Sequence, residues 1–184
     1  MKRRFVVAAA LVAASIGAAQ AQDYPTKPIR LIIATAPGGL MDIPGRLYSE
    51  FADRSNWQRV LVENRGGAGG NLGVEAVAKA APDGYTLGLI QLGNVAINPF
   101  LFKDMGFDVF NDLTPIAPMT SSAILISISS KVPATNLREF IALAKKDPGS
   151  MNHGTAGMGT VPHLAAELFS TMSGAQLTQV HYKG

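Results

Sequence analysis

Two glycine-rich segments have the residue types and spacing that bind an anion through the backbone. Ala36-Pro37-Gly38-Gly39-Leu40-Met41-Asp42 and Thr155-Ala156-Gly157-Met158-Gly159-Thr160 each leave a predicted strand and enter a predicted helix. Backbone N–H groups at a helix N-terminus are unpaired and lie at the positive end of the helix dipole, so they bind anions without Lys or Arg. In α/β sheets, ligands bind at the carboxyl ends of strands, where both segments lie. One such segment is common, but two in successive halves of the chain predict a ligand cleft.

Residues that could perform acid–base chemistry are few. The histidines are His153, His163 and His181, and neither H-x-x-H nor H-E-x-x-H spacing for a metal occurs. Asp42 and His163 could meet in space as an acid–base pair. The simpler interpretation makes Asp42 a helix N-cap and His163 a first-turn residue of a later helix. We therefore expect no catalytic residue and no metal site.

Motifs for nucleotides and covalent catalysis are absent. The stretch Gly67–Gly73 resembles a dinucleotide motif, but Leu72 stands where G-x-G-x-x-G needs its third glycine. There is no P-loop and no G-x-S-x-G nucleophile motif. The chain contains no cysteine, which excludes a disulfide framework and a thiol nucleophile. We expect no cofactor.

The basic surplus of the chain lies in its first residues. Lys2, Arg3 and Arg4 precede an uncharged run from Phe5 to Ala18, and Ala19-Gln20-Ala21 follows. This is the pattern of a secretory signal peptide, here residues 1–21, cut after Ala21. Its removal leaves 13 basic and 13 acidic residues, so the charge gives no reason to expect nucleic acid as a partner. We expect an exported protein, with an uncleaved anchor as the alternative.

Strands and helices alternate along the mature chain. We predict strands at 29–34, 60–63, 85–90, 123–129, 151–155 and 177–181, with helices near 42–53, 71–80, 137–146 and 161–173. This order predicts an α/β fold with parallel sheets. Because aspartates and prolines interrupt the pattern around residues 107–118, we place a first lobe at 22–108 and a second at 109–184. The sequence stops directly after a predicted strand, so we expect the second lobe to be incomplete.

Several ordered motifs resemble one protein family, the extracytoplasmic solute receptors of tripartite tricarboxylate transporters, also called the Bug family. The motifs are Ala36-Pro37-Gly38-Gly39 with Asp42, Val62-Glu63-Asn64-Arg65 with Gly67-Ala68-Gly69-Gly70-Asn71, Ala81-Pro82-Asp83-Gly84-Tyr85-Thr86-Leu87, Ala96-Ile97-Asn98-Pro99, and Gly159-Thr160 with His163-Leu164-Ala165. The resemblance covers essentially all of Asp23–Gly184. It implies a two-lobed periplasmic binding protein of the type II clamshell class.

The resemblance also implies a function: capture of a small carboxylate, without catalysis, for delivery to membrane permease subunits. It implies that backbone amides and ordered waters in the two glycine-rich segments hold the carboxylate, with a third contribution from the segment after the third strand. The implied ligand-binding residues are Pro37, Gly38, Gly39, Leu40, Met41, Asp42, Gln91, Asn94, Asn98, Ala156, Gly157, Met158, Gly159, Thr160 and His163.

This chain departs from the family pattern at its first glycine-rich segment. Leu40 and Met41 stand where the family usually has small polar residues, which favours a longer and more apolar acid. The family also extends well beyond the motif that ends at Gly184, so we expect this chain to be an N-terminal portion whose binding on its own is weak or absent. An exported enzyme using Asp42 and His163, and a sensor that reports the ligand to a signalling partner, remain the alternatives.

Overall fold

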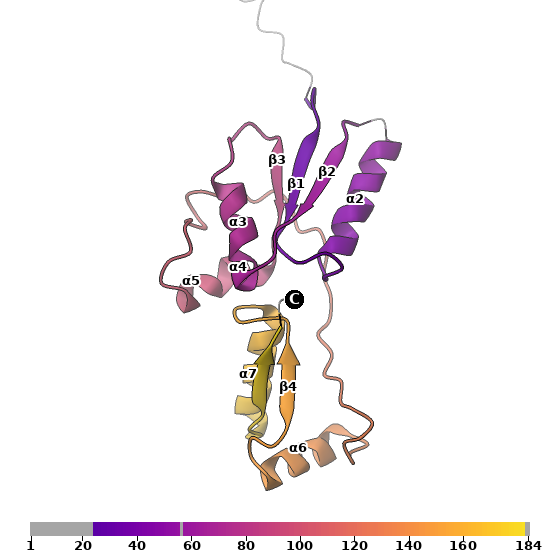
Figure 1. Ribbon diagram of the computed structural model, residues 1–184, viewed down its shortest axis with the longest axis vertical. Helices are drawn as coiled ribbons and strands as arrows, with labels where there is room; N and C mark the ends of the chain where they lie inside the picture. Colours follow the sequence, from indigo (N-terminus) through magenta and orange to yellow (C-terminus); the bar gives the residue numbers. More distant parts are fainter. Residues whose placement is uncertain (1–23, 56, 183–184) are drawn as a thin grey trace, which may run out of the picture.

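The computed structural model describes residues 24–55 and 57–182 and contains two parallel sheets (Figure 1). The predicted signal peptide lies outside the described residues. The N-terminal sheet has the order β2-β1-β3, formed by β1 (Ile29–Ile33), β2 (Val60–Asn64) and β3 (Thr86–Leu89). The C-terminal sheet pairs β4 (Asn152–Thr155) with β5 (Thr178–His181). The parallel α/β architecture predicted from the alternating elements is confirmed.

Two helices cover opposite faces of the N-terminal sheet. A Cβ atom placed on Gly45 of α2 (Asp42–Arg54) would lie 2.4 Å from Ile33 Cδ1. One placed on Gly73 of α3 (Asn71–Ala78) would lie 2.7 Å from Ala34 Cα. Because successive residues of a strand face opposite sides, α2 and α3 lie on the two sides of β1. Glycine at these positions lets each helix approach the sheet closely.

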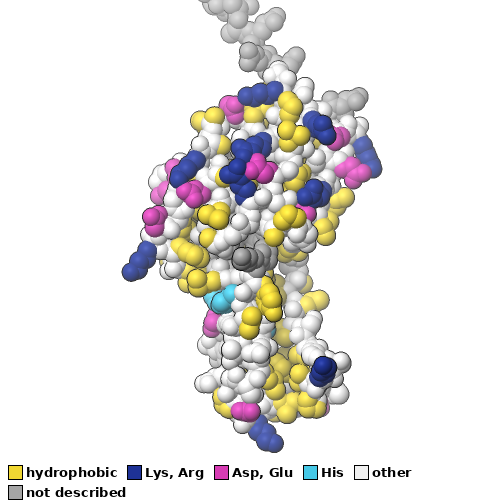
Figure 2. All heavy atoms as spheres, in the orientation of Figure 1, with side chains coloured by type: hydrophobic (Ala, Val, Ile, Leu, Met, Phe, Trp, Pro, Cys, Tyr) yellow, Lys and Arg dark blue, Asp and Glu magenta, His cyan; other side chains and the backbone are white. Residues whose placement is uncertain are grey.

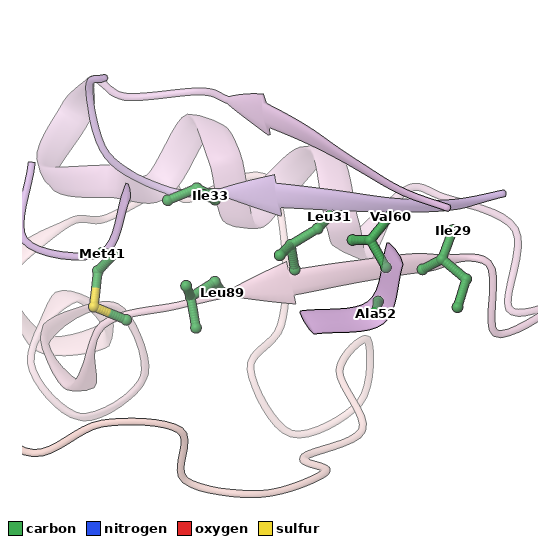
Figure 3. Close-up of a cluster of buried hydrophobic side chains, with 7 residues drawn as sticks. All are labelled: Ile29, Leu31, Ile33, Met41, Ala52, Val60 and Leu89. Atoms are coloured by element: carbon green, nitrogen blue, oxygen red, sulfur yellow. The ribbon is translucent and has the colours of Figure 1, made fainter. Parts of the chain in front are cut away.

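The main hydrophobic core lies between β1 and α2 (Figure 3). It is formed by buried side chains from the strands, the helix and the loop that joins β1 to α2: Ile29, Leu31, Ile33, Met41, Ala52, Val60 and Leu89. On the other face, Ile32 and Val74 are fully buried between β1 and α3. The sheet is therefore rigidly held on both sides, which fixes the loops that leave its carboxyl edge.

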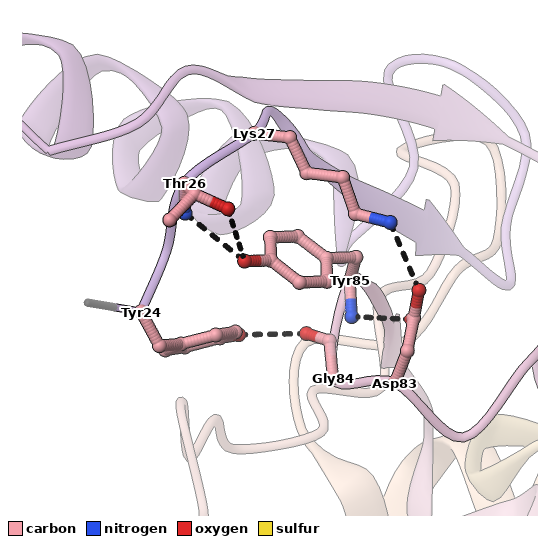
Figure 4. A network of polar contacts seen from close by, with 6 residues as sticks. All are labelled: Tyr24, Thr26, Lys27, Asp83, Gly84 and Tyr85. Atoms are coloured by element: carbon pink, nitrogen blue, oxygen red, sulfur yellow. Dashed lines mark hydrogen bonds and ion pairs between the residues drawn. The ribbon is translucent and has the colours of Figure 1, made fainter. Parts of the chain in front are cut away.

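A cluster of polar and aromatic contacts ties the start of the described chain to the turn before β3 (Figure 4). The Tyr24 hydroxyl donates to the Gly84 carbonyl at 2.7 Å, and the Thr26 N–H donates to the Tyr85 hydroxyl at 3.0 Å. Lys27 pairs with Asp83 at 3.0 Å. These contacts lie at the amino ends of the strands. They therefore stabilise the end of the sheet that is opposite to the glycine-rich segments.

The crossover between the two sheets has no regular structure. The predicted strand at 123–129 is wrong: residues 113–129 form neither helix nor strand, and Leu125 is 84% exposed. The sequence has the β-branched and aliphatic residues that favour a strand, but a strand also needs a neighbouring backbone to pair with. No described strand lies beside this segment, so its apolar side chains stay exposed.

The C-terminal unit is smaller and its core is thinner. Helix α6 (Leu137–Lys146) is capped by the Asn136 side chain, which accepts from the Glu139 N–H at 3.0 Å. Phe140 of α6 stacks on Phe169 of α7 (Val161–Ser173), with ring centroids 6.2 Å apart. The lobe boundary at 108/109 stays a prediction. None of the helices in the described part of the chain is long and apolar enough to cross a membrane.

Candidate ligand-binding site

The carboxyl edge of the N-terminal sheet meets the loop that follows β4. We call residues 156–160 the β4–α7 loop and residues 35–41 the β1–α2 loop. A Cβ placed on Gly93, in α4 (Leu92–Ala96) after β3, would lie 2.5 Å from the Gly159 carbonyl oxygen. One placed on Gly69, in η1 (Ala68–Gly70) after β2, would lie 2.4 Å from the Met158 carbonyl oxygen. Because β1 is the central strand, the β1–α2 loop leaves the same edge between these two contacts. The β4–α7 loop therefore contacts the carboxyl end of the N-terminal sheet, the end from which the β1–α2 loop also leaves, and we call this contact the junction.

Gly159 is the closest point of this junction. Its φ of +80° is a left-handed conformation that favours glycine, and an added Cβ would lie 2.1 Å from Asn98 Oδ1. Asn98 begins the short helix α5 (Asn98–Leu101) and is completely buried. The β4–α7 loop therefore contacts the start of α5 at a glycine that no other residue can replace without movement of the chain.

Three buried asparagines form a network beneath the junction. Asn94 donates to the Gly69 carbonyl at 2.7 Å and to Asn71 Oδ1 at 3.2 Å, and Asn98 donates to the same oxygen at 2.6 Å. Asn94 Oδ1 accepts from the Gln91 N–H at 3.3 Å. Asn94 and Asn98 are both 0% exposed. These side chains fasten η1 and α4 to α3 and α5. That Asn94 and Asn98 contribute to ligand binding stays a prediction.

Asp42 holds the β1–α2 loop in place. Its carboxylate accepts from the Gly38 N–H at 2.8 Å, from Arg46 Nε at 3.0 Å and from Asn64 Nδ2 at 2.8 Å. The Arg46 hydrogen bond, followed by the Gly38 N–H, lowers the pKa of Asp42 to about 2. Asp42 is not the N-cap that the sequence suggested. It is the first residue of α2, and Met41 occupies the N-cap position. The Gly38 N–H is therefore used inside the loop, and Arg46 balances the charge of Asp42.

Three backbone N–H groups at the N-terminus of α2 have no acceptor among the described residues. The N–H groups of Leu40, Met41 and Ile43 make no hydrogen bond to another described residue, and no side chain caps the helix. The Gly39 N–H, in contrast, donates to the Ala36 carbonyl at 3.0 Å. Unpaired N–H groups at a helix start carry partial positive charge that favours a bound anion.

The N-terminus of α7 has a matching set of donors. Thr160 is the N-cap residue of α7, but its hydroxyl donates to the Gly157 carbonyl at 2.6 Å and makes no capping hydrogen bond. Among the described residues, the N–H groups of Met158, Val161 and His163 also find no acceptor. His163 Nδ1 accepts from the Gly159 N–H at 3.3 Å, which places the imidazole proton of the neutral ring on Nε2.

The side chains of the two loops divide into buried and exposed groups. Met41 is 8% exposed and belongs to the hydrophobic core, so only its backbone can meet a ligand. Leu40 and Met158 are 64% and 51% exposed. Pro37 is exposed, and Ala156 and Gln91 are half-buried. Both loops could be predicted from the sequence, because glycine and proline indicate a loop without information from distant residues.

The His163 ring packs edge-on against His181, with centroids 5.0 Å apart, and His181 Nδ1 lies 2.9 Å from Thr155 Oγ1. Within residues 24–55 and 57–182, no group of three or more His, Asp or Glu side chains is arranged to hold a metal.

A surface groove of about 590 Å³ lies beside α3. The residues that line it are Arg30, Arg65, Gly66, Leu72, Glu75, Ala76 and Lys79. Its two arginines are both paired with Glu63, whose pKa they lower to about 2. Figure 2 shows charged side chains of both signs gathered over the N-terminal unit. This mixture of paired charges makes the groove a weaker anion site than the junction.

Comparison with known proteins gives the family. Residues 46–184 match the sequence profile of the tripartite tricarboxylate transporter family receptor. The chain belongs to this family. A UPF0065 protein of Bordetella bronchiseptica is 35% identical over 184 residues, which cover 99% of this chain and 54% of the relative. The chain spans about half the length of the curated relatives it matches.

Solved structures of such receptors have the same fold. A structure described as a periplasmic transporter superposes with a TM-score of 0.83 at 38% identity, covering 88% of this chain and 54% of the other. A protein of R. palustris with adipate gives 0.79 at 32% identity, with the same coverage. MatC from Rhodopseudomonas palustris with bound malate gives 0.78 at 30% identity and covers 88% and 55%. The periplasmic-binding-protein fold class is therefore confirmed.

Proposed function

We propose that this chain captures a small carboxylate as part of a periplasmic solute-binding receptor, exported by a signal peptide cut after Ala21. The bound receptor then delivers its ligand to the membrane permease subunits of a tripartite-type transporter. Family membership and the adipate and malate found in related structures support this proposal. The first lobe, residues 22–108, and the second, residues 109–184, each contribute one side of the site.

The observation that carries the proposal is that neither α2 nor α7, which each follow a glycine-rich loop, has a side-chain cap at its N-terminus. Leu40, Met41 and Ile43 supply N–H groups from α2, and Met158, Val161 and His163 supply them from α7. Neither loop contains Lys or Arg. A carboxylate between the two helix starts would gain hydrogen bonds from both sides while keeping the favourable interaction with both dipoles.

The same arrangement explains how binding would favour a closed state. A ligand that touches both loops has more contacts when the two units are together, so it shifts the population toward the closed form. Gly93 and Gly159 allow this approach, because a side chain on either would collide with the facing backbone or with Asn98. The permease would then distinguish the loaded receptor by its closed shape.

The geometry favours binding over the alternative of acid–base catalysis by Asp42 and His163. Both oxygens of Asp42 are engaged, and a pKa of about 2 leaves it a very weak base near neutral pH. His163 Nδ1 is occupied by the Gly159 N–H. Asp42 is therefore not available as the base of an acid–base pair with His163.

Isothermal titration with succinate, adipate and propane-1,2,3-tricarboxylate, carried to millimolar concentrations, tests the proposal. We expect saturable binding of at least one acid. We expect no binding of the same acid with every carboxyl group methylated, because this ester cannot place a negative charge at the helix N-termini. The acid should be recovered unchanged after prolonged incubation. Equal binding of acid and ester, or conversion of the acid to a product, would contradict the proposal.

A further inference from the structure

Three large aliphatic side chains are exposed around the junction. Leu40, Leu92 and Met158 are 64%, 65% and 51% exposed, and they follow β1, β3 and β4 respectively. Each stands next to a backbone group of the site. Leu92 precedes Gly93, which meets the Gly159 carbonyl, and Met158 presents its own carbonyl to Gly69. Methylene groups of a ligand would cover this apolar surface with a gain from burial.

Most of the polar side chains near the same backbone donors are occupied inside the protein. Asp42 and Asn64 are bonded to each other and to Arg46. The Thr155 hydroxyl pairs with His181, and the Thr160 hydroxyl with the Gly157 carbonyl.

The remaining groups do not change this picture. Thr35 Oγ1 and Asn98 Oδ1 lack a hydrogen-bond partner, but both atoms are fully enclosed. Gln91, half-buried at the start of α4, takes part in a capping box with Asn94. The site therefore offers backbone N–H groups to the carboxylate of a ligand and aliphatic side chains to its hydrocarbon chain.

A hydroxyl group on the hydrocarbon chain of the ligand would weaken binding at this site. It would lose its hydrogen bonds to water when the site closes and would face Leu40, Leu92 or Met158 in exchange. A polar group that is buried without a partner is disfavoured relative to the same molecule without that group.

From these contacts we infer that the site selects an aliphatic carboxylate without hydroxyl groups on its chain. The inference rests on the proposed function and sets this chain apart from the related structure that holds malate. Leu40, Leu92 and Met158 are the residues that determine the selection.

Matched pairs of acids that differ by one hydroxyl test the inference directly. Succinate is compared with malate, and propane-1,2,3-tricarboxylate with citrate, by isothermal titration of the chain at one pH and ionic strength. We expect the member without the hydroxyl to bind at least about tenfold more tightly in each pair. Equal or tighter binding of malate and citrate would overturn the inference and leave the proposed function standing. Binding of none of the four acids would overturn the proposed function and this inference together.

Substitution of the aliphatic side chains supplies the second arm. Leu40→Ser and Leu92→Ser should each reduce the preference for succinate over malate, because a hydroxyl on the protein can then pair with that of the ligand. Leu47→Ser on α2 is the control, since Leu47 is comparably exposed at 59% but lies outside both loops. An unchanged succinate-to-malate ratio in both variants, or an equal change in the control, would contradict the role given to Leu40 and Leu92.

Discussion

Replacing Gly159 with Ala should weaken carboxylate binding by at least about tenfold, equivalent to ~1.4 kcal/mol. The new Cβ would lie 2.1 Å from Asn98 Oδ1 and 3.1 Å from a ring carbon of Phe102. Asn98 cannot move easily, because its amide is held by Asn71 at 2.6 Å. The β4–α7 loop must therefore shift away from the N-terminal unit, and the donors of α7 shift with it. Isothermal titration with succinate measures the effect.

Gly149→Ala is a matched control for this variant. Gly149 has φ +79°, against +80° for Gly159, so both substitutions carry a similar backbone strain. A Cβ on Gly149 has only Thr178 Oγ1 nearby, at 3.8 Å, and the turn lies at the amino end of β4. We expect Gly149→Ala to lower stability while binding changes little. If the two variants bind succinate equally well, the contact between Gly159 and Asn98 does not position the site.

Replacing Asp42 with Asn should lower the free energy of unfolding by about 2 kcal/mol. The Asp42 side chain is only 7% exposed and accepts three hydrogen bonds. An amide has one oxygen, and its NH2 group would face other donors. Urea unfolding at pH 7 measures the difference. Asp53→Asn, at an exposed position of the same helix, should change stability by less than about 0.5 kcal/mol.

The pH dependence of this variant follows from the lowered pKa of Asp42. The folded-state pKa of about 2 lies below the ordinary aspartate value of about 3.9, so the ionised group stabilises the folded chain. Allowing for screening by solvent around the exposed Arg46, this contribution is about 1–2 kcal/mol. It is complete above about pH 5 and is lost as the pH falls from about 4 to 2. The stability gap between the wild-type chain and Asp42→Asn should shrink over that interval. A gap independent of pH would show that the charge of Asp42 is not what stabilises the loop.

The sequence predicts the elements whose signals are local. Ile29–Ile33 is an apolar run interrupted only by Arg30, and Val161–Ser173 has a Pro in its first turn and a Gly after its last. Both were assigned correctly. The two glycine-rich loops were found for the same reason, because Pro37-Gly38-Gly39 and Gly157-Met158-Gly159 interrupt the strand and helix patterns on either side.

Features that depend on distant partners were not predictable in this way. The strand expected at 123–129 did not form, since pairing requires another backbone and no described strand supplies it. The sequence gives no sign that Asn94 bonds to Gly69 and Asn71, which are more than twenty residues away. Asp42 was expected to cap its helix, yet Asn64 and Arg46 draw its carboxylate into the loop. Amino-acid composition does not show which polar side chains will bond to one another. The partners in these hydrogen-bond networks are therefore seen only in the folded structure.

The most direct test of the account is a titration of the 15N-labelled chain with succinate, followed through its backbone amide resonances. The account predicts that the amides of Leu40, Met41 and Ile43 and those of Met158, Val161 and His163 shift together, with one dissociation constant, because one carboxylate ligand meets both helix N-termini. Dimethyl succinate should leave all six unchanged. Shifts confined to one loop, or to the groove beside Arg30 and Lys79, would contradict the account.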